Sequence, residues 1–288
     1  MKNSRLVVLV SALALMSAFV LAACSSDDSS SDSSNAAGFE LATTIPTGEL
    51  YGLAMNKDSA NLLEAVNGAI GTMKADGSLN DIYQKWFQID APAGVTDNDT
   101  SSGGDAPDFS SELITDGTLT VGSDIPFPPF EFGKAPDYDG FDIDLVNKIA
   151  DELGLEVVIK DTSFDTIFTD VAAGKFDLVA SASTITPERE QTVNFSDPYY
   201  EAEQALLVPV GSDIASVEDL DGLTVGAQDG TTGEAYANDE TNAGEVRGFP
   251  NGPAAIAALE NGQVEATIID QPVAQDAIDK AEGSGSGS

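Results

Sequence analysis

The sequence contains no histidine and only one cysteine, Cys24, among its 288 residues. The absence of histidine excludes the Ser-His-Asp and Cys-His arrangements of nucleophilic catalysis and nearly all zinc and transition-metal chemistry. A single cysteine excludes disulfide bonds within the chain and a thiolate ligand set. Only carboxylates remain for acid–base work or for binding a hard cation, and no cofactor is expected.

Basic residues are also few. The chain has 12 Lys and Arg against 49 Asp and Glu, which gives a formal net charge of −37 at pH 7. A surface with this charge repels phosphate backbones, so a nucleic-acid partner is not expected. The same charge keeps a protein soluble and repels other acidic surfaces, and we expect a monomer.

Long apolar runs are confined to the N-terminus. Leu6–Val20 is an apolar run of 15 residues, which is too short for a comfortable membrane span. Lys2 and Arg5 precede it and small residues ending in Cys24 follow it, a pattern typical of a bacterial lipoprotein signal peptide over 1–23. We expect cleavage before Cys24, lipidation of its sulfur and an extracytoplasmic, membrane-anchored protein. An ordinary secretory signal with a chance cysteine is the alternative.

Polar segments divide the rest of the chain. Residues 24–37 are rich in Ser and Asp, which is typical of a solvated spacer. A Gly- and Ser-rich stretch within 93–112 indicates a linker. Residues 283–288 read GSGSGS, which is typical of an engineered flexible joint or tail. Two ordered blocks remain, roughly 38–92 and 112–282.

The first block predicts two strands and two helices. A strand over Phe39–Thr44 is followed by a turn at Pro46-Thr47-Gly48 and by a second strand near Tyr51–Met55. Apolar residues at helical spacing from Leu62 to Met73 predict a helix that Gly77 ends. A second helix follows directly, and we expect its apolar face in the core, with Leu79, Ile82, Tyr83, Trp86 and Phe87.

The second block alternates strands and helices, which predicts an α/β fold. Residues 172–181 resemble 259–270, and 118–124 resemble 223–229, so two βαβ-type lobes are expected. Ligands of open α/β sheets bind beyond the carboxyl ends of the strands, which makes the residues there the candidates for a site. The predicted strands are Leu119–Gly122, Glu156–Lys160, Phe176–Ser181, Leu223–Ala227 and Val264–Asp270, and the predicted helices are Asp142–Leu153, Phe164–Ala173, Gly233–Ala237, Pro253–Glu260 and one from Pro272.

Polar and aromatic residues follow the strands of the first lobe. Asp124 and Phe127 lie in a proline-rich loop, for which a rigid surface turn is the alternative. Phe164 opens a helix and suits the core nearly as well as a ligand. Arg189 stands out because bases are scarce: a guanidinium can hold a carboxylate by two parallel hydrogen bonds, although an ion pair with a neighbouring Glu is the alternative. Small residues that let a ligand approach the backbone follow the third strand: Ser181, Ala182, Ser183 and Thr184.

The second lobe offers complementary groups. Gln228 and Thr232 lie where a strand turns into a helix, and backbone N–H groups at a helix N-terminus attract anions. The spacing there fits no nucleotide-binding motif. Asp270 ends the last strand, where a carboxylate can accept an ammonium group or cap the following helix. Together with Arg189 and the apolar walls that Phe127 and Phe164 would supply, this set matches a zwitterionic α-amino acid.

The chain resembles the extracellular solute-binding proteins of family 3, the receptors of ABC importers for polar amino acids. The resemblance rests on the motifs SDIPFPPFEF, GFDIDLVNKIADELG, GKFDLVASASTITPERE, VNFSDPYY and DLDGLTVGAQDGTTGEAYA, with YGLAMNK and DGSLNDIYQKWF ahead of them. It covers nearly all of 38–95 and 113–282. It implies a two-lobed fold of the type II periplasmic-binding-protein class, which closes by a hinge on two crossing strands near Ile45–Leu50 and Ala205–Val210.

The resemblance also implies roles for the candidate residues, because the family binds one amino acid between its lobes. Arg189 would hold the ligand's carboxylate with help from Thr184 and the N–H groups at Thr232, and Asp270 would hold its ammonium group. The remaining implied contacts are the backbone near Ser181 and Ala182 at the ammonium group, Phe127 and Phe164 around the side chain, Asp124 at its polar tip and Gln228 on the facing lobe.

The order of the motifs departs from the family, because segments of the family's C-terminal end come first. We therefore expect a circularly permuted fold in which the linker joins the family's own termini. This assigns 38–49 to the edge strand of lobe 2 and the hinge, 50–92 and 113–206 to lobe 1, 93–112 to the linker, and 207–282 to lobe 2.

These observations predict an extracytoplasmic amino-acid-binding protein rather than an enzyme, either working with an ABC permease or serving as an engineered binding or sensor scaffold. Arg189 is the only evident cation at the site, so glutamine, asparagine or a basic amino acid is the expected ligand. The alternative is an enzyme on the same fold, such as a dehydratase or lyase acting on a small carboxylate. The pairing of Arg189 with Asp270 and the missing histidine argue against it.

Overall fold

The computed structural model describes residues 38–96 and 107–285, within a compact unit that begins at Ala36. No helix in these two stretches is both long enough and apolar enough to cross a membrane. Several expectations fall outside the described residues: the signal peptide 1–23, lipidation of Cys24, the spacer 24–37, the middle of the linker at 97–106 and the tail residues 286–288.

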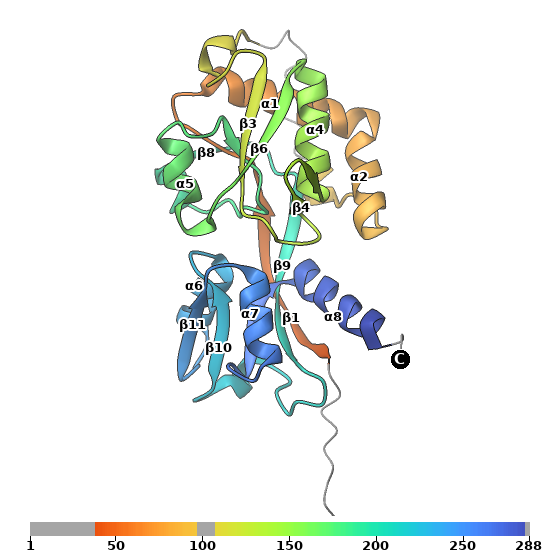
Figure 1. The fold of residues 1–288 in the computed structure, drawn as a ribbon, viewed down its shortest axis with the longest axis vertical. Helices are drawn as coiled ribbons and strands as arrows, with labels where there is room; N and C mark the ends of the chain where they lie inside the picture. Colours follow the sequence, from red (N-terminus) through yellow and green to blue (C-terminus); the bar gives the residue numbers. More distant parts are fainter. Residues whose placement is uncertain (1–37, 97–106, 286–288) are drawn as a thin grey trace, which may run out of the picture. The chain divides into compact units, whose positions relative to one another are not determined.

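One five-stranded sheet forms lobe 2, the lower part of the structure in Figure 1. Its strand order is β1-β9-β12-β10-β11, in which β10 runs parallel to β11 and β12 while β9 runs antiparallel to β12 and β1. Helices α6 and α7 pack on β10, and α8 packs on β1 and β9. The bounds are β1 Phe39–Tyr51, β9 Tyr200–Pro209, β10 Thr224–Gln228, β11 Glu245–Phe249, β12 Ala266–Asp270, α6 Thr232–Glu240, α7 Gly252–Glu260 and α8 Gln271–Gly285.

A second five-stranded sheet, in the order β6-β3-β7-β2-β8, forms lobe 1. Strand β3 runs parallel to β6 and β7, and β2 runs antiparallel to β7 and β8. Helix α5 packs on β3 and β7, α4 packs on β6, and α1 and α2 pack on α4. The bounds are β2 Ala54–Met55, β3 Thr118–Ser123, β6 Glu156–Asp161, β7 Leu178–Val179, β8 Asn194–Phe195, α1 Ala60–Asp76, α2 Ser78–Phe87, α4 Phe141–Leu153 and α5 Phe164–Ala172, with the ribbon β4 Phe132–Lys134 and β5 Asp137–Asp139, the short helix α3 Ala93–Thr96, and 3-10 turns at Ser110–Glu112, Arg189–Gln191 and Val217–Leu220.

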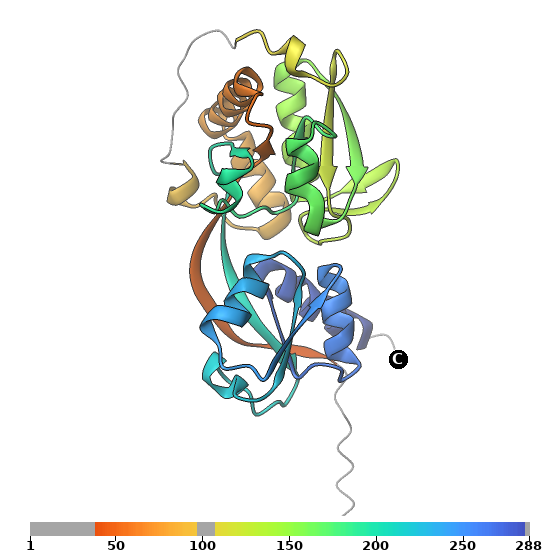
Figure 2. The same ribbon diagram turned by 90° about the vertical axis from the view of Figure 1, so that its left-hand side faces the viewer.

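The α/β class and the two lobes predicted from the sequence are confirmed, and the two crossing strands are β1 and β9 (Figure 2). The turn predicted at Pro46-Thr47-Gly48 is wrong, because β1 continues through it as a bulge. Ile45 lies opposite Gln204 and Glu49 lies opposite Ala202, so β1 holds two residues more than β9 between these pairs. A proline without an N–H and a glycine at a φ of 63° suit a bulge as well as they suit a turn.

Other differences follow from local hydrogen bonding and from exposure. The third strand of lobe 1 pairs only over Leu178–Val179 instead of Phe176–Ser181. The Asp177 carboxylate accepts the N–H of Thr120 at 2.6 Å, so a side chain takes the place of a strand partner there. Strand β11 is absent from the predicted elements because its residues at the sheet edge are mostly half-exposed and show no apolar alternation. Helix α8 continues into the predicted tail as far as Gly285.

The first block completes both lobes. Strand β1 forms the edge of the lobe 2 sheet, and β2 lies between β7 and β8 in lobe 1. The predicted core role of Tyr83 is confirmed, since it is buried with its ring centre 5.1 Å from that of Phe141 and 5.4 Å from that of Tyr200.

At the other end of the linker, the Glu112 carboxylate accepts the N–H of Leu62 at 2.8 Å and so satisfies a free donor at the start of α1.

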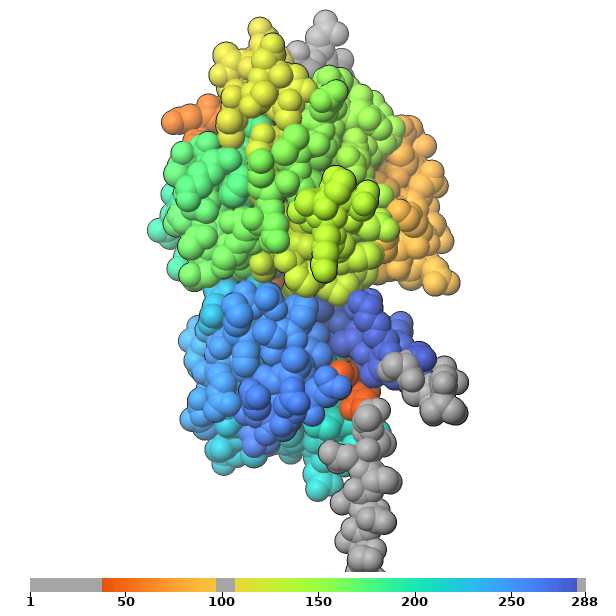
Figure 3. All heavy atoms as spheres, viewed as in Figure 1, coloured from red at the N-terminus to blue at the C-terminus, as the bar shows by residue number. Residues whose placement is uncertain are grey.

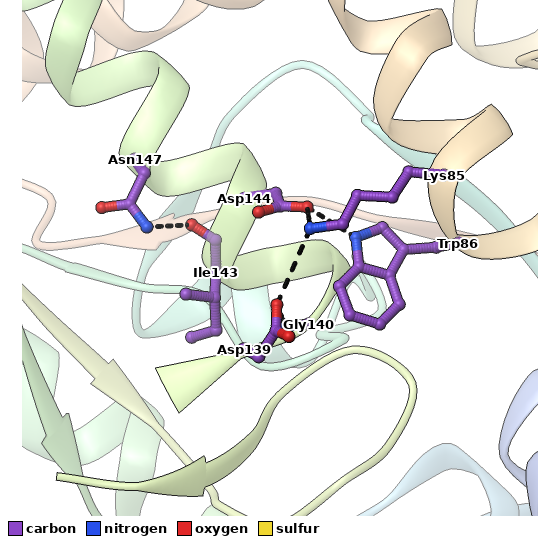
Figure 4. Close-up of polar contacts among 7 residues, drawn as sticks. All are labelled: Lys85, Trp86, Asp139, Gly140, Ile143, Asp144 and Asn147. Carbon is purple, nitrogen blue, oxygen red and sulfur yellow. Dashed lines mark hydrogen bonds and ion pairs between the residues drawn. The ribbon is translucent and has the colours of Figure 1, made fainter. Parts of the chain in front are cut away.

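Asp144 of α4 links this helix to α2 by hydrogen bonds (Figure 4). Its Oδ2 accepts hydrogen bonds from Nζ of Lys85 at 2.6 Å and from Nε1 of Trp86 at 2.7 Å. Nζ of Lys85 also lies 3.7 Å from Oδ1 of Asp139 and 4.6 Å from the centre of the Trp86 ring. Because Lys85 is half-exposed, its ion pairs contribute little. The indole bond to a charged acceptor is the stronger link between the two helices.

We predict that Asp144→Ala lowers the free energy of unfolding by about 1–2 kcal/mol, because it removes two charge-assisted hydrogen bonds between helices. Glu152→Ala is the matched control, since Glu152 pairs only with Lys148 one turn away on the same helix, and it should cost less than about 0.5 kcal/mol. Urea unfolding of both variants measures the difference. Equal losses would contradict the role given to Asp144.

Candidate ligand-binding site

A cavity of about 300 Å³ lies between the two lobes. This volume includes space that is open to solvent. All ten residues selected from the sequence line it, together with Thr231: Asp124, Phe127, Phe164, Ser181, Ala182, Thr184, Arg189, Gln228, Thr232 and Asp270.

The topology explains why these residues meet. Asp124 directly follows β3, and Ser181 lies just beyond β7, at the carboxyl ends of parallel strands in lobe 1. In lobe 2, Gln228 and Asp270 are the last residues of β10 and β12, which are also parallel, and Thr232 is the first residue of α6. Carboxyl ends of parallel strands share one sheet edge, and the two edges face the same cavity.

The two lobes are in direct contact around this cavity. The side-chain amide of Gln228 in lobe 2 donates to Oδ2 of Asp124 in lobe 1 at 2.6 Å, and both residues are buried. Nη2 of Arg189 in lobe 1 donates to the carbonyl oxygen of Gly230 in lobe 2 at 3.1 Å. Figure 3 shows side chains of the two lobes meeting along their boundary. The structure is therefore a closed form.

Arg189 lies at one end of the cavity, on a 3-10 turn after the third strand of lobe 1. Its Nη1 donates to the carbonyl oxygen of Thr184 at 2.8 Å, and its guanidinium carbon lies 5.2 Å from the ring centre of Phe164 and 4.6 Å from that of Phe168. Burial lowers the pKa of Arg189, while the charges of Glu49 and Asp270 act to raise it. The guanidinium hydrogen bonds go to backbone carbonyls, so the alternative of a surface ion pair with a neighbouring Glu does not describe them.

Asp270 supplies the opposite charge. Its carboxylate accepts a hydrogen bond from the side-chain amide of Gln204, a fully buried residue of β9. Burial, reinforced by the charge of Glu49, raises the pKa of Asp270 to about 7. A neighbouring cation would stabilise its ionised form. The position therefore suits an ammonium group.

Asp124 gives the cavity a second carboxylate. Burial raises the pKa of Asp124 to about 6, although the hydrogen bond from Gln228 opposes this, and the nearby charge of Asp161 adds to the rise. Asp124 remains mostly ionised at neutral pH, so this region favours a cationic or hydrogen-bond-donating group.

Glu49 belongs to the site but was not selected from the sequence. It is 9% exposed on β1, and its Oε2 accepts from the hydroxyl groups of Thr184 at 2.6 Å and Thr232 at 2.8 Å. Its Oε1 accepts from the Gln204 amide at 3.2 Å. The signal that points to it is its place two residues before Tyr51: both side chains share one face of the strand, and both are buried.

Two further acids lie behind the cavity wall, and sequence reasoning missed these too. Oε1 of Glu131 accepts from the hydroxyl of Ser181 at 2.7 Å, and Oδ2 of Asp142 accepts from the N–H of Ala182 at 2.8 Å and the hydroxyl of Tyr199 at 2.8 Å. Ala182 has a φ of 42°, an uncommon value for a residue with a side chain, and the Asp142 bond holds it there.

The second oxygens of this pair, Oε2 of Glu131 and Oδ1 of Asp142, are buried without a hydrogen-bond partner. Burial raises the pKa of both groups, and for Glu131 the neighbouring Asp142 charge raises it further. Two adjacent buried carboxylates do not both ionise readily, which is the cause of the raised pKa values. Within the described residues, no group of acids is arranged to hold a metal ion.

The fold and the cavity define a two-lobed α/β protein with a closed, charged pocket where the sheet edges face each other. The model of the bacterial extracellular solute-binding proteins, family 3, matches residues 2–89 and 119–280. The chain belongs to this family.

Related proteins match a limited share of their own length. A probable histidine-binding protein of Campylobacter jejuni is 36% identical over 167 residues, which cover 58% of this chain and 65% of that protein. The arginine-binding extracellular protein ArtP of Bacillus subtilis is 37% identical over 116 residues, 40% of this chain and 46% of that protein. This chain thus spans less than two thirds of the length of either relative.

Solved structures are also similar to this chain. An ancestral arginine-binding protein bound to glutamine is 42% identical, covers 58% of this chain and 75% of its own, and has a TM-score of 0.55. The arginine-, lysine-, histidine-binding protein ArtJ of Geobacillus stearothermophilus is 36% identical, covers 58% of this chain and 72% of its own, and also has a TM-score of 0.55.

The buried acids predict how stability depends on pH. An aspartate in an unfolded chain takes up its proton near pH 3.9, whereas Asp124 and Asp270 do so near pH 6 and 7 and the pair behind the cavity also titrates high. The folded state therefore binds more protons between these values, and the free energy of unfolding falls as pH rises from about 4 to about 7.

We expect the ligand-free protein to melt at least about 5 °C higher at pH 5 than at pH 8, because one such buried group corresponds to several kcal/mol. Melting should be followed in high salt, which screens repulsion between surface acids but not the buried groups. Asp142→Asn is the control and should flatten the dependence. A melting temperature that rises from pH 5 to pH 8 would contradict the assignment.

Proposed function

We propose that this chain is an extracytoplasmic receptor that encloses one polar or basic L-amino acid between its lobes. One observation carries the proposal: a guanidinium from Arg189 and a carboxylate from Asp270 line the same cavity between the lobes. The names of the related proteins, which bind arginine, histidine or glutamine, support it.

In the proposed complex the ligand's carboxylate faces Arg189. Two of the five guanidinium N–H donors are used by the carbonyl oxygens of Thr184 and Gly230, so donors remain for a carboxylate. The N-terminus of α6 at Thr232 adds a favourable dipole for an anion. The ligand's ammonium group faces Asp270, and the rings of Phe127 and Phe164 enclose its side chain.

Charge favours a basic or amide side chain. Asp124 and Phe127 both line the cavity, and Asp161 adds negative charge near Asp124. A glutamate or aspartate ligand would bring a second carboxylate against these acids, and Arg189 is occupied by the first one. Arginine, lysine, histidine, glutamine and asparagine are therefore the proposed ligands.

An enzyme on the same fold is not favoured. The named relatives are binding proteins, and an amino-acid-binding precursor of cyclohexadienyl dehydratase is also among the similar structures, with 42% identity and a TM-score of 0.53. The charged groups that line the cavity are held by neutral partners: Arg189 donates to a backbone carbonyl, and Asp270 and Asp124 accept from the side-chain amides of Gln204 and Gln228. We further propose that residues 1–23 direct export, that a lipid on Cys24 anchors the receptor, and that an ABC permease accepts its ligand.

We also infer that the chain is circularly permuted relative to its family. The 167 residues that match the Campylobacter protein are close in number to the residues of 113–282, about 170, as expected if a collinear match can follow only one of the two blocks. The family model itself matches in two separate stretches. The other block supplies β1 to the sheet of lobe 2 and β2 to the sheet of lobe 1. It also supplies α1 and α2, which pack on α4.

The receptor proposal is tested by thermal shift with the twenty amino acids, followed by calorimetry on those that stabilise the protein. We expect stabilisation by basic or amide amino acids and none by glutamate. Arg189→Ala should weaken binding of every ligand by at least about 100-fold, because it removes a charged partner of the carboxylate. Arg247→Ala is the matched control, since Arg247 pairs with Glu245 at the surface, and it should leave affinity unchanged. Failure of all twenty to protect the wild-type protein would refute the proposal.

The permutation is tested by restoring the family order. A reordered protein that runs from 107 to 285 and then from 38 to 96, with a short flexible join, should fold with the same circular dichroism and bind the same amino acids within about tenfold. The expectation follows because β1 and α8, which would be joined, already pack together in lobe 2. A reordered protein that remains unfolded would contradict the inference.

A further inference from the structure

Glu49 is a charged residue inside the closed site that does not line the cavity itself. It lies on β1, directly after the two-residue bulge in the pairing with β9, where the strand passes between the lobes. From there its carboxylate reaches Thr184 in lobe 1 and Thr232 in lobe 2. Glu49 thus touches the two threonine hydroxyl groups that line the cavity near its charged end.

The direction of these hydrogen bonds follows from chemistry. A carboxylate only accepts, and each hydroxyl has a single hydrogen to donate. With Oε2 of Glu49 at 2.6 Å from the hydroxyl of Thr184 and 2.8 Å from that of Thr232, both hydrogens point at Glu49. The two hydroxyl oxygens also lie 3.5 Å apart, which is longer than either bond to Glu49, so with both hydrogens on Glu49 they offer only lone pairs to the cavity. They can accept from an N–H donor and cannot donate to an anion.

Gln204 reinforces this polarity. Its amide nitrogen donates to Oε1 of Glu49 and to Asp270, and it also lies 3.4 Å from the hydroxyl oxygen of Thr232. Two negative groups, Glu49 and Asp270, then share this end of the site with the single positive charge of Arg189, whose pKa both of them influence. One additional positive charge in the cavity would neutralise the excess.

We propose that Glu49 is the positioning residue that makes this end of the cavity selective for a ligand's α-ammonium group. It acts through the hydroxyl groups of Thr184 and Thr232, which it turns into acceptors, and through its charge beside Asp270. The inference rests on the proposed function, since it assigns a specificity determinant to that same amino-acid site.

The test compares each amino acid with the same molecule lacking its α-amino group. The two pairs are L-arginine with 5-guanidinopentanoate and L-glutamine with glutaramate, measured by calorimetry at pH 7.5. Wild-type protein should prefer the amino member of whichever pair it binds by at least about 100-fold. Glu49→Gln should weaken the amino member by about 10- to 100-fold and change the other member by less than about threefold, so the preference collapses.

Glu203→Gln is the matched control. Glu203 lies on the partner strand β9 and accepts the N–H of Gly48 in the same bulge, but it points away from the cavity-lining threonines and bonds the backbone instead. This variant should leave both affinities unchanged. It separates a local effect of the hinge strand from an effect of the Glu49 carboxylate on the ligand.

Two outcomes would overturn the inference: an equal loss for both members of a pair, which indicates a merely structural role, or no change for either. If Glu49→Gln fails to fold, Thr184→Val in the wild-type background must show the same loss of amine preference, with Thr184→Ser retaining it. If the wild-type protein binds neither pair nor any of the twenty amino acids, the proposed function itself fails, and that result is distinct from a wild type that binds without depending on Glu49.

Discussion

The pairing of β1 with β9 is the interaction on which the rest of the structure depends. It runs from Phe39 opposite Pro209 to Tyr51 opposite Tyr200, and it is the contact by which the first block of the chain enters both lobes. The same pairing sets the site, because β1 carries Glu49 and β9 carries Gln204 to the charged end of the cavity. An edge strand with unpaired backbone groups invites aggregation, and here α8 packs beside β1 and covers it.

The site is built at a cost in stability. Four of the carboxyl groups at the site are buried, those of Glu49, Asp124, Glu131 and Asp142, and that of Asp270 is half-buried. The charges of Glu49 and Asp270 act on the Arg189 guanidinium. Burying an uncompensated charge is unfavourable, so most of these groups hold protons more tightly than usual. A ligand ammonium group would remove part of this cost by neutralising Asp270.

The sequence predicted the cavity better than it predicted the support behind it. Asp124, Gln228 and Asp270 could be found because they follow or end buried strands, and strand ends in an α/β fold converge. Glu49 and Gln204 were not selected. The turn predicted at Pro46 and Gly48, which is in fact a bulge, separated Glu49 from its strand, and the strand of Gln204 was expected to begin only at Ala205. A bulge changes which side chains face inward, and a local pattern does not reveal the register of a partner about 150 residues away. Edge strand β11 was missed because half-exposed residues leave no alternating pattern.

The contacts between the closed lobes have a consequence for affinity. The lobes are held together by Gln228 on Asp124, by Arg189 on the carbonyl of Gly230 and by Glu49 on Thr184 and Thr232. Several of these groups are the ones that a bound amino acid would use. A ligand that enters must therefore replace some of these hydrogen bonds instead of adding to them. Its affinity is the difference in free energy between the protein with its own hydrogen bonds and the complex with the ligand's hydrogen bonds. Contacts that the protein's own groups do not already make with one another contribute most to that difference. A cation placed between Glu49, Asp270 and two threonine oxygens that only accept is such a contact, which is why the ammonium end of the ligand, more than its carboxylate, should decide what the closed form retains.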